Sequence, residues 1–247
     1  MTKEEQMFLK HIEDLSDRSY YQNRPCFTDF LDMNQQSLIH NYYKGSIRPV
    51  LYGGYDFAER QIACFSESNE FYEFPVCWLK ISPISKKFSE LLTHRDFLGS
   101  ILGLGLERSC IGDIIIDDTS AYVLCLERVK SLIINELNQV RHTNVIVSES
   151  VLSDKLLCPK FEIIKGSVSS IRLDAVISLA FRSSRSQSCA LIESGQVYIN
   201  GRLNTSNGAA LKDNDRISVR HKGKFIFVDS QNKSKKNKCI VEIHKYV

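Results

Sequence analysis

Residues 170–203, SIRLDAVISLAFRSSRSQSCALIESGQVYINGRL, decide the fold of the last third of this chain. The stretch opens with a helix pattern, because Leu173 begins an apolar i, i+3, i+4, i+7 stripe and Ser170 can cap the first turn. A second helix is expected from Ser184, which forms an S-x-x-Q capping box with Gln187. The stretch therefore predicts two short helices in succession.

A small antiparallel sheet is expected to follow these helices. Gly195 suits the left-handed position that ends a helix, and Val197 and Ile199 then alternate as in a strand. The pair Asn200-Gly201 is preferred in two-residue type I′ hairpin turns. We therefore expect a module of two helices on a twisted sheet over residues 160–228.

Basic side chains gather where the second helix begins. A helix N-terminus offers backbone N–H groups to phosphate, and guanidinium groups can bind phosphate oxygens in pairs. Arg182 and Arg185 flank this N-terminus, and a basic strand edge over residues 216–224 would extend the positive surface. The interpretation requires that these groups share one surface and are not taken up by internal carboxylates. The residues expected on these grounds to contact phosphate are Arg172, Arg182, Ser184, Arg185, Ser186, Arg202, Arg216, Arg220 and Lys222.

The charge of the chain is unevenly distributed. Residues 161–247 hold 15 Lys and Arg against 7 Asp and Glu, a net charge of +8, which leaves −5 for residues 1–160. A basic C-terminal third indicates a polyanionic partner, although charge alone leaves open a merely solvated basic surface.

The sequence predicts a cytoplasmic protein without a membrane partner. No apolar run approaches the ~18 residues that a membrane-spanning helix needs. The first five residues, Met1-Thr2-Lys3-Glu4-Glu5, are acidic where a secretory signal is basic and then apolar.

The cysteines and histidines show no metal-ligand spacing. The closest two of the 8 cysteines are 13 residues apart, so the chain has no C-x-x-C pair for zinc or redox chemistry. We expect reduced cysteines in apolar surroundings, no metal, no cofactor and no small-molecule substrate.

We expect two segments before the module and one after it. The expected fold class of the whole chain is α+β. Residues 1–68 are expected to form a small α/β region, with a helix N-cap at Asp32. Residues 69–148 alternate in the order βα(α)ββαβ, which predicts a ferredoxin-like middle domain. Residues 229–247 are expected to be a basic C-terminal tail, either a disordered arm or a loop before a short strand at residues 240–243.

The order of these motifs resembles the S4 RNA-binding domain. The matching points are Arg172-Leu173-Asp174, Ser184-Arg185-Ser186 and the run from Gly195 to Arg202. Gln196 departs from the family, in which many members carry Lys or Arg at this position, and one phosphate contact is in doubt there. The RNA-facing positions that the resemblance implies are Arg172, Ser184, Arg185, Ser186, Gln187, Asn200 and Arg202.

The rest of the chain resembles the YlmH-type proteins, which are bacterial S4-domain proteins with another RNA-binding domain before the S4 module. The run from His94 to Gly105 is similar to their middle domain, and the run from Gly53 to Arg60 to their N-terminal region. The resemblance implies a factor that acts on stalled large ribosomal subunits carrying peptidyl-tRNA, with rRNA, tRNA or both as partners. We expect a monomer, with a second RNA site at His94, Arg95 and Arg108.

An RNA-modifying enzyme is the rival hypothesis. Pseudouridine synthases often carry an S4 domain and a catalytic aspartate in an R-L-D motif, but Arg172-Leu173-Asp174 lies inside the S4 module, where Asp174 suits a helix start. Asp96 or Asp113 would then have to be the acting carboxylate. We predict a non-catalytic RNA-binding protein with no catalytic residue.

Overall fold

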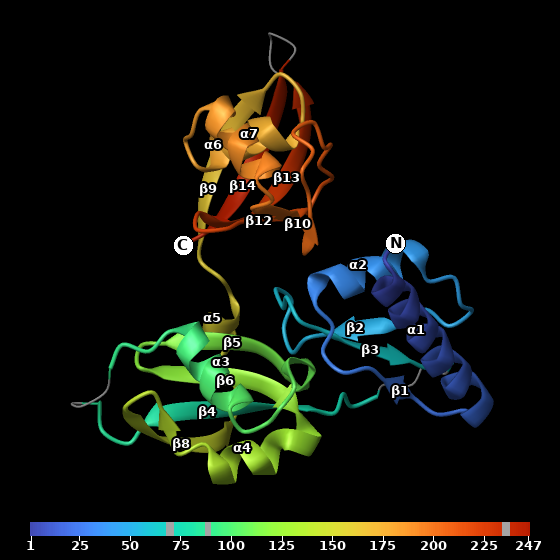
Figure 1. Ribbon diagram of the computed structural model, residues 1–247, viewed down its shortest axis with the longest axis vertical. Helices are drawn as coiled ribbons and strands as arrows, with labels where there is room; N and C mark the ends of the chain where they lie inside the picture. Colours follow the sequence, from blue (N-terminus) through green and yellow to red (C-terminus); the bar gives the residue numbers. More distant parts are fainter. Residues whose placement is uncertain (68–71, 87–89, 234–237) are drawn as a thin grey trace. The chain divides into compact units, whose positions relative to one another are not determined.

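The computed structural model describes residues 1–67, 72–86, 90–233 and 238–247 (Figure 1). The chain divides into two units, Met1–Cys158 and Pro159–Val247. The first unit contains both segments predicted over residues 1–68 and 69–148, and one hydrophobic core joins them. Phe30 and Ile62 of the first segment are fully buried in the same cluster as residues of the second.

The N-terminal region packs two helices on a small antiparallel sheet with the strand order β1-β3-β2. The expected cap of the second helix is confirmed, because Asp32 and Gln35 form a reciprocal capping box. Ile12 and Phe65 lie at the centre of a local cluster beneath these helices. The elements are α1 (Lys3–Gln22), β1 (Cys26–Phe27), α2 (Met33–Tyr42), β2 (Val50–Tyr52) and β3 (Ile62–Phe65).

The middle of the chain has the expected ferredoxin-like arrangement. Its antiparallel sheet has the order β5-β6-β4-β8-β7, which is the order of a split βαβ repeat with one added edge strand, β7. Phe97 of α3 and Ile133 of α4 are buried against the sheet. The elements are β4 (Val76–Pro83), α3 (His94–Leu102), η2 (Arg108–Cys110), β5 (Ile111–Asp117), β6 (Ser120–Leu126), η3 (Glu127–Val129), α4 (Lys130–Glu136), β7 (Gln139–Val140) and β8 (Thr143–Ser150).

The C-terminal unit, which follows the short helix α5 (Asp154–Leu157), places α6 and α7 on one face of a six-stranded antiparallel sheet (Figure 1). The strand order is β11-β10-β12-β13-β14-β9. The predicted turns are confirmed, because φ is +72° at Gly195, +48° at Asn200 and +76° at Gly201. The elements are β9 (Phe161–Val168), α6 (Leu173–Ala180), α7 (Arg185–Glu193), β10 (Val197–Ile199), β11 (Arg202–Leu203), β12 (Arg216–Val219), β13 (Gly223–Lys233) and β14 (Cys239–Tyr246).

The structure corrects the prediction of a C-terminal tail over residues 229–247, whereas the alternative of a strand at residues 240–243 is confirmed within β14. Strand β13 continues to Lys233, and β14 pairs with it and with β9 along its whole length. Val241 and Ile243 are fully buried in the core of the unit, which explains why the last strand is integral to the fold. Residues 234–237 of the predicted tail lie outside the described residues.

The predicted cap of the first helix in this unit is also wrong. Arg172, not Ser170, is the N-cap of α6, and its side chain makes no capping hydrogen bond. The first N–H groups of the helix instead donate to a distant loop, from Leu173 to the carbonyl of Ala209 at 2.9 Å and from Asp174 to that of Asn207 at 3.2 Å. A long-range contact therefore replaces the local cap.

Candidate nucleic-acid interface

Arg172 and Arg185 converge on one buried carboxylate. Asp174 stands in the first turn of α6, and its side chain is 4% exposed. Its Oδ1 lies 3.1 Å from Nε of Arg172, and its Oδ2 lies 2.7 Å from Nη2 of Arg185 at the start of α7. The two arginine side chains remain 44% and 56% exposed. We call Arg172, Asp174 and Arg185 the arginine cluster.

The electrostatics of the arginine cluster leave it able to bind an anion. Burial by itself raises the pKa of the Asp174 carboxyl, but hydrogen bonds and charges from Arg185 and Arg172 outweigh burial and lower the pKa below 3.8. Both guanidinium groups are thus paired with an internal carboxylate, contrary to the condition stated for the predicted phosphate site. The ionised carboxylate, however, neutralises only one of their two positive charges. Each guanidinium has five N–H donors, and Asp174 accepts from one nitrogen of Arg185 and two of Arg172. The remaining donors of these exposed groups can bind phosphate.

The N-terminus of α7 lies beside the arginine cluster and is capped as predicted. The hydroxyl of Ser184 accepts from the backbone N of Gln187 at 3.2 Å, and Oε1 of Gln187 accepts from the backbone N of Ser184 at 3.0 Å. The hydroxyls of Ser184 and Ser186 are 2.9 Å apart. All of these residues are exposed. Their polar groups and the Arg185 guanidinium therefore lie at the surface, within the first turn of α7.

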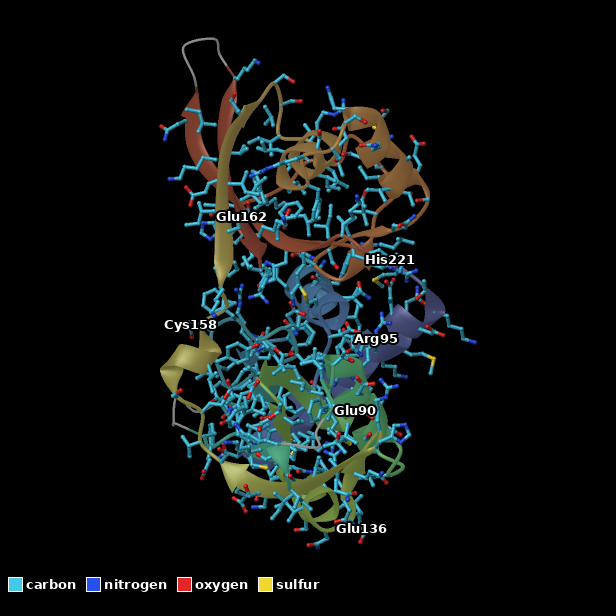
Figure 2. The ribbon with its side chains drawn as sticks, turned by 90° about the vertical axis from the view of Figure 1, so that its left-hand side faces the viewer. Glu90, Arg95, Glu136, Cys158, Glu162 and His221 are labelled. Carbon is cyan, nitrogen blue, oxygen red and sulfur yellow. The ribbon has the colours of Figure 1, made fainter. Side chains whose placement is uncertain are left out.

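Two predicted contact residues are engaged elsewhere, which corrects the prediction of a single cradle. Arg182 directs Nη2 towards Glu162 of β9, at 3.5 Å (Figure 2 labels Glu162). Asn200 uses both ends of its side-chain amide internally, because it donates to Asp215 at 2.8 Å and accepts from the backbone N of Arg216 at 2.9 Å. Asn200 therefore has a structural role in the hairpin.

The predicted basic strand edge is also wrong. Strand β12, which carries Arg216, lies between β10 and β13 and is an interior strand. Ile217 and Val219 are buried beneath the helices, so Arg216 and Arg220 face away from α6 and α7. Lys222 lies in the exposed turn before β13, next to His221 (Figure 2).

Arg202 is the remaining predicted residue, and it lies on the helix-bearing side of the sheet. It pairs across the hairpin with Ile199, whose side chain packs against the helix-side core. Directly opposed residues in antiparallel strands point to the same face. The helix-bearing side thus holds Arg202 and the residues around the starts of α6 and α7, whereas Arg216 and Arg220 lie on the opposite face.

The middle domain separates the three residues of the predicted second site. His94 and Arg95 are exposed in the first turn of α3 (Figure 2 labels Arg95). Arg108 is half-buried and donates to the carbonyl oxygens of Ile111 and Gly112. Burial, with a smaller effect of the neighbouring Arg60 charge, lowers the pKa of Arg108 to about 10. Its guanidinium is therefore hydrogen-bonded within the fold, unlike the exposed side chains of His94 and Arg95, and its RNA contact stays a prediction.

The two carboxylates that the enzymatic hypothesis requires both have structural partners. Asp96 accepts from the backbone N and the hydroxyl of Thr93 and so caps α3. Asp113 accepts from the Tyr55 hydroxyl at 2.9 Å and from the backbone N of Glu59 at 2.7 Å. Burial raises the pKa of Asp113, and these hydrogen bonds oppose the rise. Asp113 thereby ties the N-terminal region to the middle domain.

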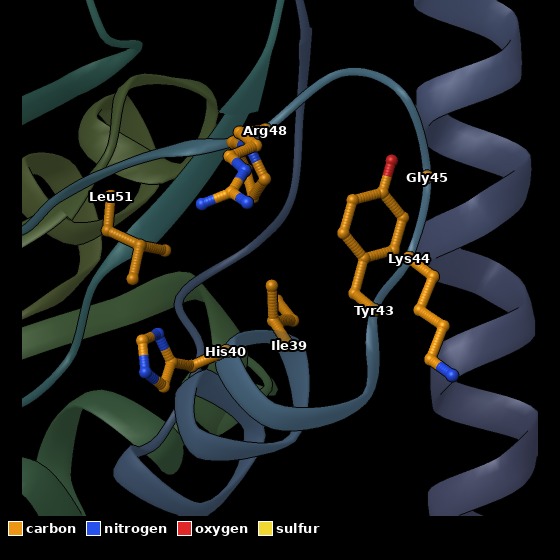
Figure 3. Close-up of a pocket in the computed structure, with 8 residues that line it drawn as sticks. Ile39, His40, Tyr43, Lys44, Gly45, Arg48 and Leu51 are labelled. Atoms are coloured by element: carbon orange, nitrogen blue, oxygen red, sulfur yellow. The ribbon is translucent and has the colours of Figure 1, made fainter.

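A pocket of about 440 Å³ lies between the end of α2 and the start of β2, and no sequence pattern indicated it. Ile39, Tyr43 and Leu51 give it apolar walls, and Arg48 and His40 add basic groups (Figure 3). Figure 3 shows the Arg48 guanidinium over the cavity, whereas the Lys44 side chain extends away from it.

Residues 1–67, 72–86, 90–233 and 238–247 contain neither a cluster of metal ligands nor a helix that could span a membrane. No group of three or more His, Cys, Asp or Glu side chains in these residues is arranged to hold a metal ion. No helix among them is both long and apolar enough to cross a membrane.

Comparisons with known proteins bear on both units. The family models "Putative RNA-binding domain in YlmH" and "S4 domain" match residues 70–154 and 171–217. "Ribosome-associated protein quality control protein P2" of Bacillus subtilis (strain 168) is 29% identical over 241 residues, which cover 96% of this chain and 93% of that protein. The chain thus carries a YlmH-type RNA-binding domain and an S4 domain, and it is similar to this relative over nearly its whole length.

A solved structure has a similar fold over part of the chain. "Cell division protein ylmH from Streptococcus pneumoniae" matches with a TM-score of 0.54 and 19% identity, over 63% of this chain and 96% of that one. The S4 match, residues 171–217, contains the arginine cluster and the start of α7. Strands β13, β14 and β9, which complete the sheet, lie outside the matched residues.

Proposed function

We propose that this protein binds structured RNA of the ribosome through the arginine cluster and the N-terminus of α7. It acts, in this proposal, as a non-catalytic cytoplasmic monomer on large subunits that still carry peptidyl-tRNA. The partners are rRNA, tRNA or both.

The observation that carries the proposal is the pairing of two exposed arginines with one buried aspartate. Asp174 holds Arg172 and Arg185 on neighbouring helices without cancelling their combined charge. Their positions are therefore set before RNA arrives, which lowers the entropic cost of binding. The hydroxyls of Ser184 and Ser186, and Arg202 on the same side of the sheet, add further groups that can contact phosphate oxygens.

The ribosomal setting is supported by the relative from Bacillus subtilis, whose name describes a ribosome-associated protein of quality control. The similarity to that protein extends over 96% of this chain, so it includes the N-terminal region as well as the two matched domains. The match of residues 70–154 to the family model of an RNA-binding domain supports a further RNA contact in the middle domain. We propose His94 and Arg95 as the residues of that contact.

A non-catalytic role agrees with the positions of the candidate carboxylates. Asp96 caps a helix, and Asp113 is enclosed by three donors from a neighbouring loop. The Asp of the Arg172-Leu173-Asp174 motif is buried between two arginines. Each of these aspartates has a role that the fold itself requires.

The proposal is tested with the full chain and purified large ribosomal subunits, by measuring affinity over a range of salt concentrations. The triple variant Arg172→Gln, Asp174→Asn, Arg185→Gln removes the charges without leaving a buried carboxylate unpaired. We expect weaker binding and a slope of log K against log salt that is shallower by about 1.4 to 1.8, because two phosphate contacts are lost.

Lys10→Gln is the matched control, since it removes one exposed charge from α1, far along the chain from the arginine cluster. It should leave both the affinity and the slope unchanged. A folded triple variant that binds large subunits with unchanged affinity and salt dependence contradicts the proposed site.

A further inference from the structure

The C-terminal sheet has a second face, opposite α6 and α7, which we call the outer sheet face. The buried residues Val197, Ile217 and Phe225 point towards the helices, so the residues that alternate with them point away. The outer sheet face is defined here by Phe161, Tyr198, Ser218, Arg220, Lys224 and Tyr246.

The strand register lines up five of these residues in one row across the sheet. Tyr198 of β10 is opposite Ser218 of β12, and Ser218 is opposite Lys224 of β13. Tyr246 of β14 is opposite Phe161 of β9, and Nζ of Lys224 lies 4.6 Å from the centre of the Tyr246 ring. The row therefore has aromatic rings at both ends, with a small side chain and a cation between them.

The aromatic rings of the row are associated with cations and with each other. The guanidinium carbon of Arg220 lies 5.2 Å from the centre of the Tyr198 ring. The rings of Phe161 and Tyr246 are 4.9 Å apart and meet edge to face, at 68°. Ser218 between them is exposed and small, and the Tyr198 and Tyr246 side chains are half-buried.

The outer sheet face is positively charged. Glu242 also lies on it, but that carboxylate is paired with Lys165 at 2.9 Å and with His244 at 2.7 Å. Arg216, Arg220 and Lys224 add three more cations on β12 and β13 and the turn between them. An anionic partner is therefore favoured over a neutral apolar one.

We infer that the outer sheet face binds unpaired nucleotides of RNA, by stacking bases on Tyr198 and Tyr246 and by contacting phosphates with Arg220 and Lys224. Aromatic side chains interleaved with cations suit a single strand, because its bases expose faces that a duplex conceals. The inference rests on the proposed function and extends it. The arginine cluster would bind the backbone of folded RNA, and the opposite side of the sheet would bind an unpaired segment.

The test uses the full chain and two labelled RNAs, a short unstructured oligoadenylate and a stable hairpin. Tyr198→Leu and Tyr246→Leu keep apolar volume but remove the ring, whereas Tyr198→Phe and Tyr246→Phe keep the ring. We expect each Leu variant to lose at least about fivefold in affinity for the oligoadenylate, and each Phe variant to bind it as the wild type does. Affinity for the hairpin should not change. Circular dichroism and thermal melting establish that the variants are folded.

The outcomes separate this inference from the proposed function. Folded Leu variants with wild-type affinity for the oligoadenylate overturn the inference, as does a wild type that binds the hairpin but not the oligoadenylate. If the triple variant of the arginine cluster still binds the hairpin and large subunits normally, the proposed function fails while the inference stands on the Leu variants. Leu variants that bind both RNAs normally but lose large-subunit binding identify a protein contact instead, and the inference is then wrong.

Discussion

Arg185 and Asp174 lie on different helices, yet Nη2 of Arg185 is 2.7 Å from Oδ2 of Asp174. This ion pair joins the start of α7 to the start of α6. Arg172 pairs with the other oxygen of the same carboxylate. One interior aspartate thus determines where two surface guanidinium groups stand. It contributes to the stability of the C-terminal unit and to the shape of its positive surface.

Asp174→Asn should lower the free energy of unfolding of the C-terminal unit by about 1.5 to 3 kcal/mol, the range for hydrogen bonds to charged groups. The substitution removes the charge that holds two arginines together at a site that is 4% exposed. Denaturant titration of the full chain, with hydrogen exchange of α6 and α7 amides, measures the effect. Asp213→Asn, at an exposed turn, is the control and should change little. Equal stability of the two variants would show that the pairing is not stabilising.

The contribution of Asp174 should depend on pH in a defined direction. The arginines lower the pKa of the folded-state carboxyl below 3.8, the ordinary value that it regains on unfolding. A depressed folded pKa means that the stabilisation is complete above the unfolded pKa and is lost as the pH falls through the folded one. The stability difference between wild type and Asp174→Asn should therefore be constant near neutral pH and narrow below about pH 4. Denaturant unfolding of both proteins at several pH values from neutral to acidic measures this stability difference. A stability difference that grows as the pH falls contradicts the prediction.

Arg108→Gln should destabilise the first unit without changing its affinity for RNA. The guanidinium donates to the carbonyl oxygens of Ile111 and Gly112, and the shorter glutamine side chain cannot reach both. The free energy of unfolding should therefore fall by about 1 to 2 kcal/mol. Arg95→Gln is the matched substitution on the exposed surface of α3 and should leave stability unchanged. Thermal melting and large-subunit binding of the two variants distinguish the roles. Reduced RNA affinity in a stable Arg108→Gln protein would place Arg108 in the second site.

Asn200→Ala should destabilise the hairpin by about 1 to 2 kcal/mol, and Asn200→Gly by less. Alanine loses the bonds to Asp215 and to the backbone of Arg216, and it tolerates a φ of +48° poorly. Glycine loses the same bonds but adopts that φ freely. Chemical denaturation provides the comparison. If both variants were as stable as wild type yet bound RNA weakly, Asn200 would be a contact residue after all.

The local structure of this protein was readable from the sequence wherever neighbouring residues determine it. The capping boxes at Asp32 and Ser184 and the left-handed turn at Asn200-Gly201 depend on groups only a few residues apart. The ferredoxin-like order of the middle domain followed from the alternation of strand and helix patterns. The RNA-binding module could be recognised for the same reason, because its motifs lie within one short stretch.

The grouping of the cations was decided by the tertiary structure alone. The sequence indicated that Arg185 and Arg220 are both basic residues of one module, but the first lies at the start of α7 and the second on the opposite side of the sheet. Strand order, the crossing of α6 and α7 and the closure of the sheet by β14 are set by burial of residues far apart in the chain. Such contacts depend on which apolar faces exclude water together, and a linear pattern of residue types does not specify those partners.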